Sequence, residues 1–364
     1  MSDSVKNNET DKKIIEQLES GGISSIAQDE VKGFKKFMRT STFWVICFEI
    51  FLILFFGFLS EDHVFFKLNN LLTVALNASQ MIILAIGVTF LISAGEFDLS
   101  VGTNLILSST ISAKVLKAIA GTPEQIASGQ YPNLVEGVIV AILVAVLVGI
   151  AGGLINGLLV TKLKLPAFIA TLSTMFAFWG IALVISNGAQ EVGIPRQLQY
   201  SFGHKKLLEL IPYPLILALI IAAILFLIMK YTKFGLYTRA IGSSQESARR
   251  AGIKVDLYRI CIYMLVGGLT AVGGFIDLAR FATTNPQGHQ TDGLMAVMAV
   301  VMGGTSMAGG NASIGGTVLA SLVPVMLQMG MIVLKISSFY QMIATGIFLI
   351  IAVYIDQRRN FGYR

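Results

Sequence analysis

The residues best suited to chemistry lie in a basic stretch, 230–259, between two long apolar segments. This stretch holds seven Lys and Arg residues against two acids, Glu246 and Asp256. Near its centre stands the run Glu246-Ser247-Ala248-Arg249-Arg250-Ala251-Gly252. Because Lys and Arg concentrate in the cytoplasmic loops of membrane proteins, the bias places this stretch in the cytoplasm. The chemistry we expect is docking: a short helix there faces a soluble partner rather than lipid.

A second group of polar residues joins two apolar segments at 95–102, where Glu96, Asp98 and Ser100 lie close together. Acidic residues between apolar segments are costly in lipid, so they must cap a helix, face water or bind something. Two interpretations of Asp98 are open. Either Asp98 or Ser100 caps the next helix by accepting a bond from a free backbone N–H, or Asp98 contacts a solute.

The apolar segment that begins at Pro166 carries a polar and aromatic stripe. Phe168, Thr171 and Thr174 recur at i, i+3 and i+6, which predicts that they share a helix face. Such a stripe suits a pore that passes hydroxyl-rich solutes, although threonines also hydrogen-bond to neighbouring membrane helices. We add Asn311 as a pathway candidate, because it lies in a run of six glycines at 303–317 that permits a broken helix at membrane depth.

Catalytic and metal sites are not supported. Cys47 and Cys261 have no CxxC or Cys/His companion, and the three histidines are scattered through predicted outside loops. The sequence contains neither HExxH nor GxSxG. Asp277 and Arg280, three apart, are expected to neutralise one another, whereas Glu49 has no partner nearby in sequence.

The elements that position these residues are membrane helices. The chain is 54% hydrophobic and 13% charged, and its apolar residues form blocks of about 20, enough to cross a hydrocarbon core of ~30 Å. The sequence therefore predicts an all-α, polytopic membrane protein. The net charge of +6 comes from cations in loops flanking the spans, so no nucleic-acid partner is expected. Ten candidate segments are predicted: 42–60, 70–94, 100–120, 134–155, 166–187, 211–230, 259–281, 293–307, 314–334 and 338–356.

The third and eighth segments are the weakest of the ten. Segment three carries two lysines, and segment eight is short and runs into the glycines, so it is a candidate for a broken or re-entrant segment. If all ten reverse the chain, sixteen Lys and Arg lie on cytoplasmic flanks and eight on the other side. Both termini are therefore predicted to be cytoplasmic. Residues 1–40 form a cytoplasmic tail in which 31–39 is either an amphipathic helix on an anionic leaflet or a lead-in to the first span.

Five sequence motifs, taken in order over about residues 42–357, resemble the permease subunit of bacterial ATP-binding-cassette importers of the ribose/xylose/galactose type. They are GEFDLSVG (95–102), INGLLVTKLKLPAFIATLSTM (155–175), FGLYTRAIGSSQESARRAGI (234–253), MGGTSMAGG (302–310) and GTV (316–318).

The resemblance implies the fold of a type II importer permease in a bacterial inner membrane. It also implies a dimer, with a second copy or a related chain, together with a separate ATPase that binds ATP and Mg²⁺ and an extracytoplasmic solute-binding protein. This chain itself binds no cofactor on that interpretation. The coupling helix of the family maps onto Glu246, Ala248 and Gly252, and Arg249 and Arg250 lie in the same run.

The chain departs from the pattern of the family at three places. The run 95–102 reads GEFDLSVG where the family often has GGIDLSVG, so Glu96 and Phe97 differ from the usual residues. Thr291-Asp292-Gly293-Leu294 stands where a Glu-Leu pair is common. Asp277 replaces a small or apolar residue. These departures leave the identity of the solute open among pentoses, hexoses, a sugar-like signalling molecule and nucleosides.

Two other functional classes compete with this interpretation. An ion-coupled secondary transporter would need a buried carboxylate as its ion site, and Glu49, Glu96, Asp98 and Asp277 are the candidates. An intramembrane enzyme is disfavoured, since no catalytic motif is present.

Overall fold

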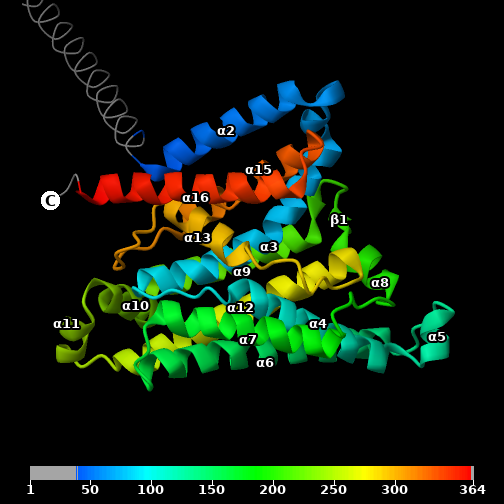
Figure 1. Ribbon diagram of the computed structural model, residues 1–364, viewed down its shortest axis with the longest axis horizontal. Helices are drawn as coiled ribbons and strands as arrows, with labels where there is room; N and C mark the ends of the chain where they lie inside the picture. Colours follow the sequence, from blue (N-terminus) through cyan, green and yellow to red (C-terminus); the bar gives the residue numbers. More distant parts are fainter. Residues whose placement is uncertain (1–37, 39, 362–364) are drawn as a thin grey trace, which may run out of the picture.

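The chain folds into a bundle of helices that run side by side (Figure 1). The computed structural model describes Met38 and residues 40–361. Its longer helices are α2 (Ser41–Leu59), α3 (Leu68–Ser93), α4 (Val101–Ala120), α6 (Leu134–Thr161), α7 (Ala167–Ser186), α9 (Tyr213–Tyr231), α10 (Lys233–Ser243), α12 (Val255–Phe281), α13 (Asp292–Met302), α15 (Leu322–Val333) and α16 (Ser338–Phe361). The short elements are η1 (Glu61–Phe66), α5 (Pro123–Ala127), α8 (Arg196–Leu198), η2 (Gln199–Gly203), β1 (Lys206–Leu207), β2 (Ile211–Pro212), α11 (Gln245–Arg250) and α14 (Ile314–Ala320).

Seven helical segments in the described part are long and apolar enough to cross a membrane. They are α2, α3, α6, α7, α9, α12 and the α14–α15 pair, Ile314–Val333. Each of the ten segments expected from the sequence overlaps a helix, but α4 is more polar than these seven and α13 has 11 residues. At 1.5 Å per residue α13 spans about 16 Å, half of a hydrocarbon core. The structure thus supports a multi-pass protein, while ten crossings remain a prediction.

Successive long helices carry the chain back and forth between two ends of the bundle (Figure 1). One end carries α10, α11, the beginning of α2 and the last described turn of α16. The opposite end carries α5, α8 and the antiparallel hairpin in which Lys206 faces Pro212 and Leu207 faces Ile211. Below, these are called the α11 end and the hairpin end.

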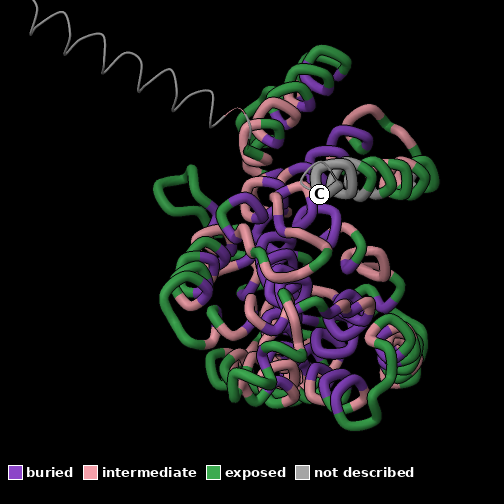
Figure 2. Tube along the Cα trace, turned by 90° about the vertical axis from the view of Figure 1, so that its left-hand side faces the viewer, coloured by how far each residue is buried: buried purple, intermediate pink, exposed green. Residues whose placement is uncertain are grey.

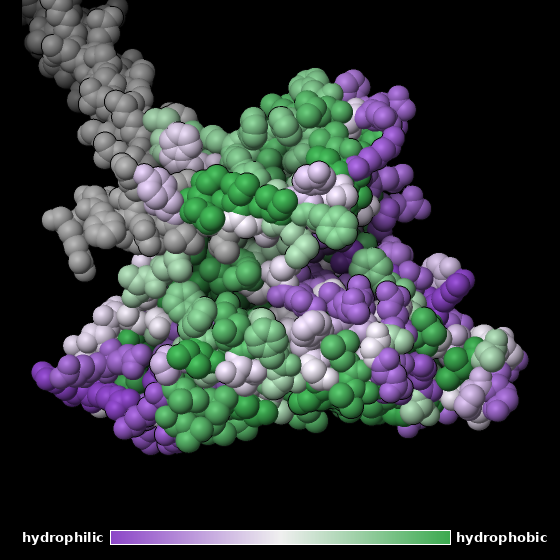
Figure 3. Space-filling view, in the orientation of Figure 1, coloured by the Kyte–Doolittle hydropathy of each residue, from purple (hydrophilic) through white to green (hydrophobic). Residues whose placement is uncertain are grey.

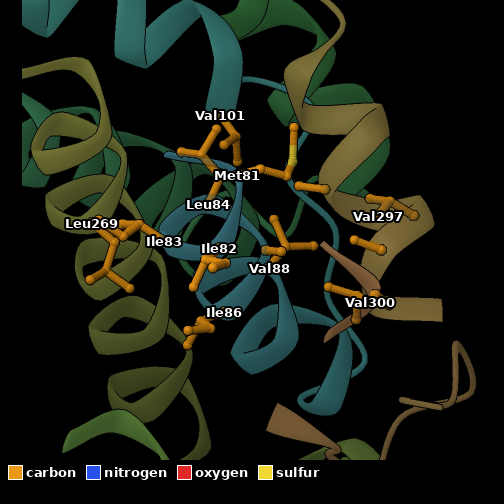
Figure 4. Packing of buried hydrophobic residues seen from close by; sticks show 14 of the residues in the cluster. Met81, Ile82, Ile83, Leu84, Ile86, Val88, Val101, Leu269, Val297 and Val300 are labelled. Atoms are coloured by element: carbon orange, nitrogen blue, oxygen red, sulfur yellow. The ribbon is translucent and has the colours of Figure 1, made fainter. Parts of the chain in front are cut away.

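Helix α3 forms the centre of the bundle, since every residue from Ala78 to Ser93 is buried. Figure 4 shows side chains of its middle turns, among them Ile83 and Val88, packed between Leu269 of α12 and Val297 of α13. In the end-on view, buried residues occupy the middle and exposed ones the periphery (Figure 2).

Helices α6 and α12 approach each other closely because glycines face one another. A Cβ atom built on Gly149 would lie 2.2 Å from the carbonyl oxygen of Gly267, and one on Gly153 would lie 2.1 Å from that of Tyr263. Small residues at such contacts are typical of membrane helices. The close approach fixes the position of α12 against α6.

The outer surface has the polarity expected of a protein in a bilayer. Hydrophobic side chains cover the flanks of the bundle, and hydrophilic ones gather towards its ends (Figure 3). Exposed residues include Phe58, Leu147 and Val184. Lipid chains would cover this surface.

The glycine-rich run separates two helices, as expected. Helix α13 ends at Met302 and α14 begins at Ile314, and Gly304, Gly309 and Gly310 between them have positive φ angles. The segment 31–39, expected to be either an amphipathic helix or a lead-in to the first span, lies outside the described residues apart from Met38.

Candidate functional site

Helices α10 and α11 form the exposed charged segment that the sequence predicted. Thr232 begins α10, and the Ser244 hydroxyl begins α11 by accepting a hydrogen bond from the Ser247 N–H at 3.2 Å. The segment turns out of α11 at Gly252, whose φ of +82° favours glycine. The short helix α11 therefore lies exposed at one end of the bundle (Figure 1).

The predicted docking residues divide into an outward and an inward group. Glu246, Arg249, Arg250 and Gly252 are exposed, and Arg250 pairs with Glu246 at 2.5 Å. Ala248 is buried and packs with Ile241 and Val255. Ala248 therefore attaches α11 to the protein, and the other four residues form its free surface.

A buried carboxylate holds the α11 segment against the rest of the bundle. The Glu96 side chain, 2% exposed, lies in the loop between α3 and α4, and Arg259 of α12 donates from Nε to its Oε1 at 2.6 Å. The Tyr263 hydroxyl lies 3.1 Å from Glu96 Oε2 and 3.1 Å from the Phe97 carbonyl oxygen. Gln245, the first residue of α11, donates to Glu96 Oε1 at 3.4 Å. We call Glu96, Gln245, Arg259 and Tyr263 the Glu96 cluster.

Two residues further along the same loop, Asp98 anchors a second buried network. Its Oδ1 accepts hydrogen bonds from the backbone N–H and the hydroxyl of Ser100, at 2.7 and 2.6 Å. Its Oδ2 accepts from Asn156 of α6 at 3.1 Å, and Asn156 Oδ1 accepts from the Thr174 hydroxyl of α7 at 2.6 Å. Burial raises the pKa of Asp98 and outweighs the opposing hydrogen bonds from Ser100 and Asn156.

Neither form of the capping prediction holds. Ser100 is the N-cap of α4, yet its side chain makes no capping bond. Asp98 accepts from the N–H of Ser100 itself, one position before the helix begins, so it fixes the loop rather than the first turn of α4.

The predicted stripe on α7 does not form one face. Thr171 and Thr174 are buried, but Phe168 is 59% exposed. At 100° per residue, positions i and i+6 lie 120° apart, which separates Phe168 from Thr174. Thr171 donates to the Ala167 carbonyl oxygen within its own helix. Asn311 is exposed, and its carbonyl oxygen accepts from Ser93, so of these candidates only Asp98 and Thr174 meet through a shared partner.

A partly buried cluster that the sequence reasoning missed lies on the hairpin side of the bundle, between the last turns of α12 and the middle of α3. His289, between α12 and α13, contacts Asp292 Oδ2 through Nδ1 at 2.8 Å and Asp277 Oδ2 through Nε2 at 3.1 Å. Gln80 of α3 donates to Asp292 at 3.2 Å. Burial lowers the pKa of His289, but the carboxylates of Asp292 and Asp277 outweigh it and hold the pKa well above its usual value.

This His289 cluster, made of Gln80, Asp277, His289 and Asp292, corrects two expectations. His289 is not an isolated loop residue, and Asp277 pairs with it rather than with Arg280. The Arg280 guanidinium donates to Asn77 instead. Two of the three departures from the family pattern, at Asp277 and Thr291–Leu294, contribute to this cluster, and that is the signal in the sequence that pointed towards it.

A cavity of about 860 Å³ with both polar and apolar lining residues opens beside the His289 cluster. It is lined by residues from α3, α12, α13 and α15, including Asn77, Gln80, Asp277, Arg280 and Gln328. Asp277 and Arg280 are 6% and 4% exposed, and among the described residues Asp277 Oδ1 and Arg280 Nε have no hydrogen-bond partner. Buried polar groups ordinarily find a partner, so this lining retains capacity to bind a polar molecule.

Comparisons with known proteins agree on one kind of relative. The profile of the family described as "Branched-chain amino acid transport system / permease component" matches residues 70–353. The ribose import permease protein of Bacillus subtilis (strain 168) is 39% identical over 294 residues, which is 80% of this chain and 85% of that protein. The ribose import permease protein of Escherichia coli (strain K12) is 31% identical over 81% of this chain and 88% of the relative.

A third relative broadens the range of sugars. The D-allose transport system permease protein of Escherichia coli (strain K12) is 30% identical over 88% of this chain and 91% of its own length. No solved structure matches the chain.

Proposed function

The chain belongs to the permease family of the branched-chain amino acid transport type, and from this premise we propose that it forms the membrane pathway of an importer for a monosaccharide. It is the non-catalytic membrane subunit of an ATP-binding-cassette importer, and ATP hydrolysis belongs to a separate partner. The comparisons give no support to an ion-coupled secondary transporter.

The observation that carries the sugar assignment is the similarity to a ribose import permease over 80% of the chain. The two further relatives described above are named for ribose and D-allose, whereas the family description names branched-chain amino acids. We therefore propose a pentose or hexose as the solute, and a branched-chain amino acid such as leucine is the alternative solute to be tested.

The substrate is tested through the partner that selects it. We would tag the chain at its native locus, purify it gently and identify co-purifying proteins by mass spectrometry. A duplicated ATPase and a solute-binding protein are expected, and the binding protein should be thermally stabilised by a pentose or hexose. Stabilisation by leucine alone would contradict the sugar assignment, and uptake by the isolated chain under an ion gradient would contradict the importer.

The proposed topology places the α11 end in the cytoplasm. The beginning of α2 and the last described turn of α16 lie at that end (Figure 1), and Lys and Arg concentrate there. With ten crossings, a periplasm-active reporter fused after Arg364 should stay silent, and the same reporter inserted after Glu124 of α5 should be active. Activity after Arg364 would overturn this orientation.

The exposed surface of α11 is the proposed contact with the ATPase. Glu246, Arg249, Arg250 and Gly252 supply that surface, while Ala248 holds the helix from beneath. Glu246→Lys should reduce ATPase association and uptake, because it reverses a charge in the contact and breaks the pair with Arg250. Glu124→Lys, a charge reversal at an exposed site of the hairpin end, is the matched control. Normal uptake by Glu246→Lys would remove Glu246 from the mechanism.

For the pathway, Asp98 and Thr174 are the stronger of the residues selected from the sequence, since Asn156 joins them inside the bundle. Phe168, Thr171 and Asn311 remain predictions, to be tested by single cysteine replacements and solute protection from a thiol reagent. Protection at none of these positions would place the pathway elsewhere.

The cavity at the hairpin end is the proposed place where the solute first meets the permease. Its volume suits a small ligand, and its amides, carboxylates and guanidinium offer the donors and acceptors that sugar hydroxyls need. Gln328→Leu should raise the solute concentration needed for half-maximal uptake. An unchanged value would exclude Gln328 from solute contact.

A further inference from the structure

The loop between α3 and α4 touches both the segment proposed to meet the ATPase and the helices at the centre of the bundle. Glu96 in this loop binds Gln245 of α11 and Arg259 of α12. Asp98, two residues later, binds Asn156 of α6 and through it Thr174 of α7. One short loop thus connects four helices by side-chain hydrogen bonds.

The bond between Glu96 and Arg259 has the short distance and the burial of a strong interaction. The Arg259 bond is a charge-assisted contact of 2.6 Å between side chains that are 12% and 2% exposed. By contrast, the ion pairs on the outer side of α11 are open to solvent, with Glu246 and Arg250 three-quarters or more exposed. The Arg259 bond fixes Glu96 to α12, while α11 is joined to the same carboxylate by the Gln245 bond of 3.4 Å. A second contact, the Arg249–Asp256 ion pair of 2.6 Å, joins α11 to α12.

The connection from Glu96 to Asp98 is short and held in place. The Phe97 carbonyl oxygen between them is 3.1 Å from the Tyr263 hydroxyl, which also contacts Glu96. Gly242 of α10 packs directly on the end of α3, where an added Cβ would lie 1.9 Å from the Ser93 carbonyl oxygen. Movement of α10 would therefore press on the backbone at the end of α3. Movement of α11 would act on the Glu96 cluster through Gln245.

We propose that Glu96 is the positioning residue that transmits displacement of α11 to α6 and α7 through the Glu96-Phe97-Asp98 loop. The proposal rests on the proposed function, because it requires an ATPase that moves α11. It adds a residue outside the docking run, at a position where this chain departs from the usual family pattern. The carboxylate is bonded to Gln245, Arg259 and Tyr263 within the chain, and on this proposal it sets how far movement of α11 reaches α6 and α7.

The test uses the complete complex of permease, ATPase and binding protein in proteoliposomes. Uptake and ATP hydrolysis are measured together for wild type, Glu96→Gln and the control Glu124→Gln, which makes the same carboxyl-to-amide change at an exposed site. Glu96→Gln keeps the size of the side chain but weakens its bond to Arg259. We expect the complex to assemble and hydrolyse ATP, while solute imported per ATP falls at least about fivefold.

A residue with only a structural role would give a different result. Yield, hydrolysis and uptake would then fall in parallel and the ratio of uptake to hydrolysis would match wild type, which would overturn the proposal. Should Glu96→Gln fail to fold, Tyr263→Phe removes one hydroxyl from the same cluster and must lower the same ratio by a smaller factor. Absence of ATP-driven uptake in the wild-type complex would overturn the proposed function itself, a result separable from any effect of the variants.

Discussion

The two ends of helix α12 carry buried polar clusters of the same size but different chemistry. At the α11 end, Arg259 and Tyr263 hold the Glu96 carboxylate. At the hairpin end, Asp277 binds His289, which in turn binds Asp292. Both clusters connect α12 to α3 or to the loop that follows it, so one helix, fixed against α6 by glycines, joins both functional ends.

The difference between the clusters lies in which group carries the positive charge. A guanidinium is always protonated near neutral pH, whereas an imidazole is the side chain that gains and loses its proton there. The Glu96 cluster is therefore a fixed attachment. The His289 cluster is an attachment whose strength depends on pH.

The largest effect on stability is expected at the fixed cluster. Glu96→Ala leaves the Arg259 guanidinium buried without its carboxylate, which should lower the free energy of unfolding by about 3–5 kcal/mol. Thermal unfolding of the detergent-solubilised protein would measure the loss. Glu61→Ala is the control, since Glu61 pairs with Lys335 on an exposed surface and its loss should change stability much less. Equal losses would show that burial does not distinguish the pairs.

A somewhat smaller effect is expected from His289→Gln at low pH. The substitution removes charge-assisted bonds to Asp277 and Asp292, which should lower the free energy of unfolding by about 3 kcal/mol. The pKa of His289 is raised in the folded protein, so its stabilisation is complete below the ordinary pKa of about 6.5 in the unfolded chain. It is lost as the pH rises through the raised pKa of the folded state.

The comparison is sharpened by measuring how the effect of His289→Gln on the melting temperature depends on pH. The gap in melting temperature between wild type and His289→Gln should narrow as the pH rises above about 6.5. A flat gap for His289→Gln would mean that its proton does not hold the cluster together.

The smallest effect is expected within the Asp98 network. Thr174→Val leaves the buried Asn156 Oδ1 without the hydroxyl that donates to it, which should lower the free energy of unfolding by about 1–2 kcal/mol. Thr174→Ser keeps the donor and is the matched control. If both variants lose the same stability, packing of the methyl group, not the hydrogen bond, is what α7 contributes.

Sequence patterns captured the local features well. The run 246–252 was predicted to contain a short exposed helix, and the apolar blocks marked the long helices, because charge and hydrophobic length are properties of consecutive residues. The stripe on α7 was wrong because a repeat of three drifts around a helix of 3.6 residues per turn. The close contact of Asp277 with His289 was missed for a related reason: spacing along one helix gives neighbours on that helix but cannot identify a partner from another segment.

By itself the sequence determined that this is a multi-pass helical membrane protein with an exposed charged segment at 230–259. Those conclusions follow from composition, length and charge, which need no knowledge of packing. Only the tertiary structure brought Glu96 to Arg259 and Asp277 to His289, residues separated by 163 and 12 positions. A buried charge takes whichever partner the close packing of helices places beside it, and that placement depends on contacts such as Gly149 with Gly267 that no local pattern records.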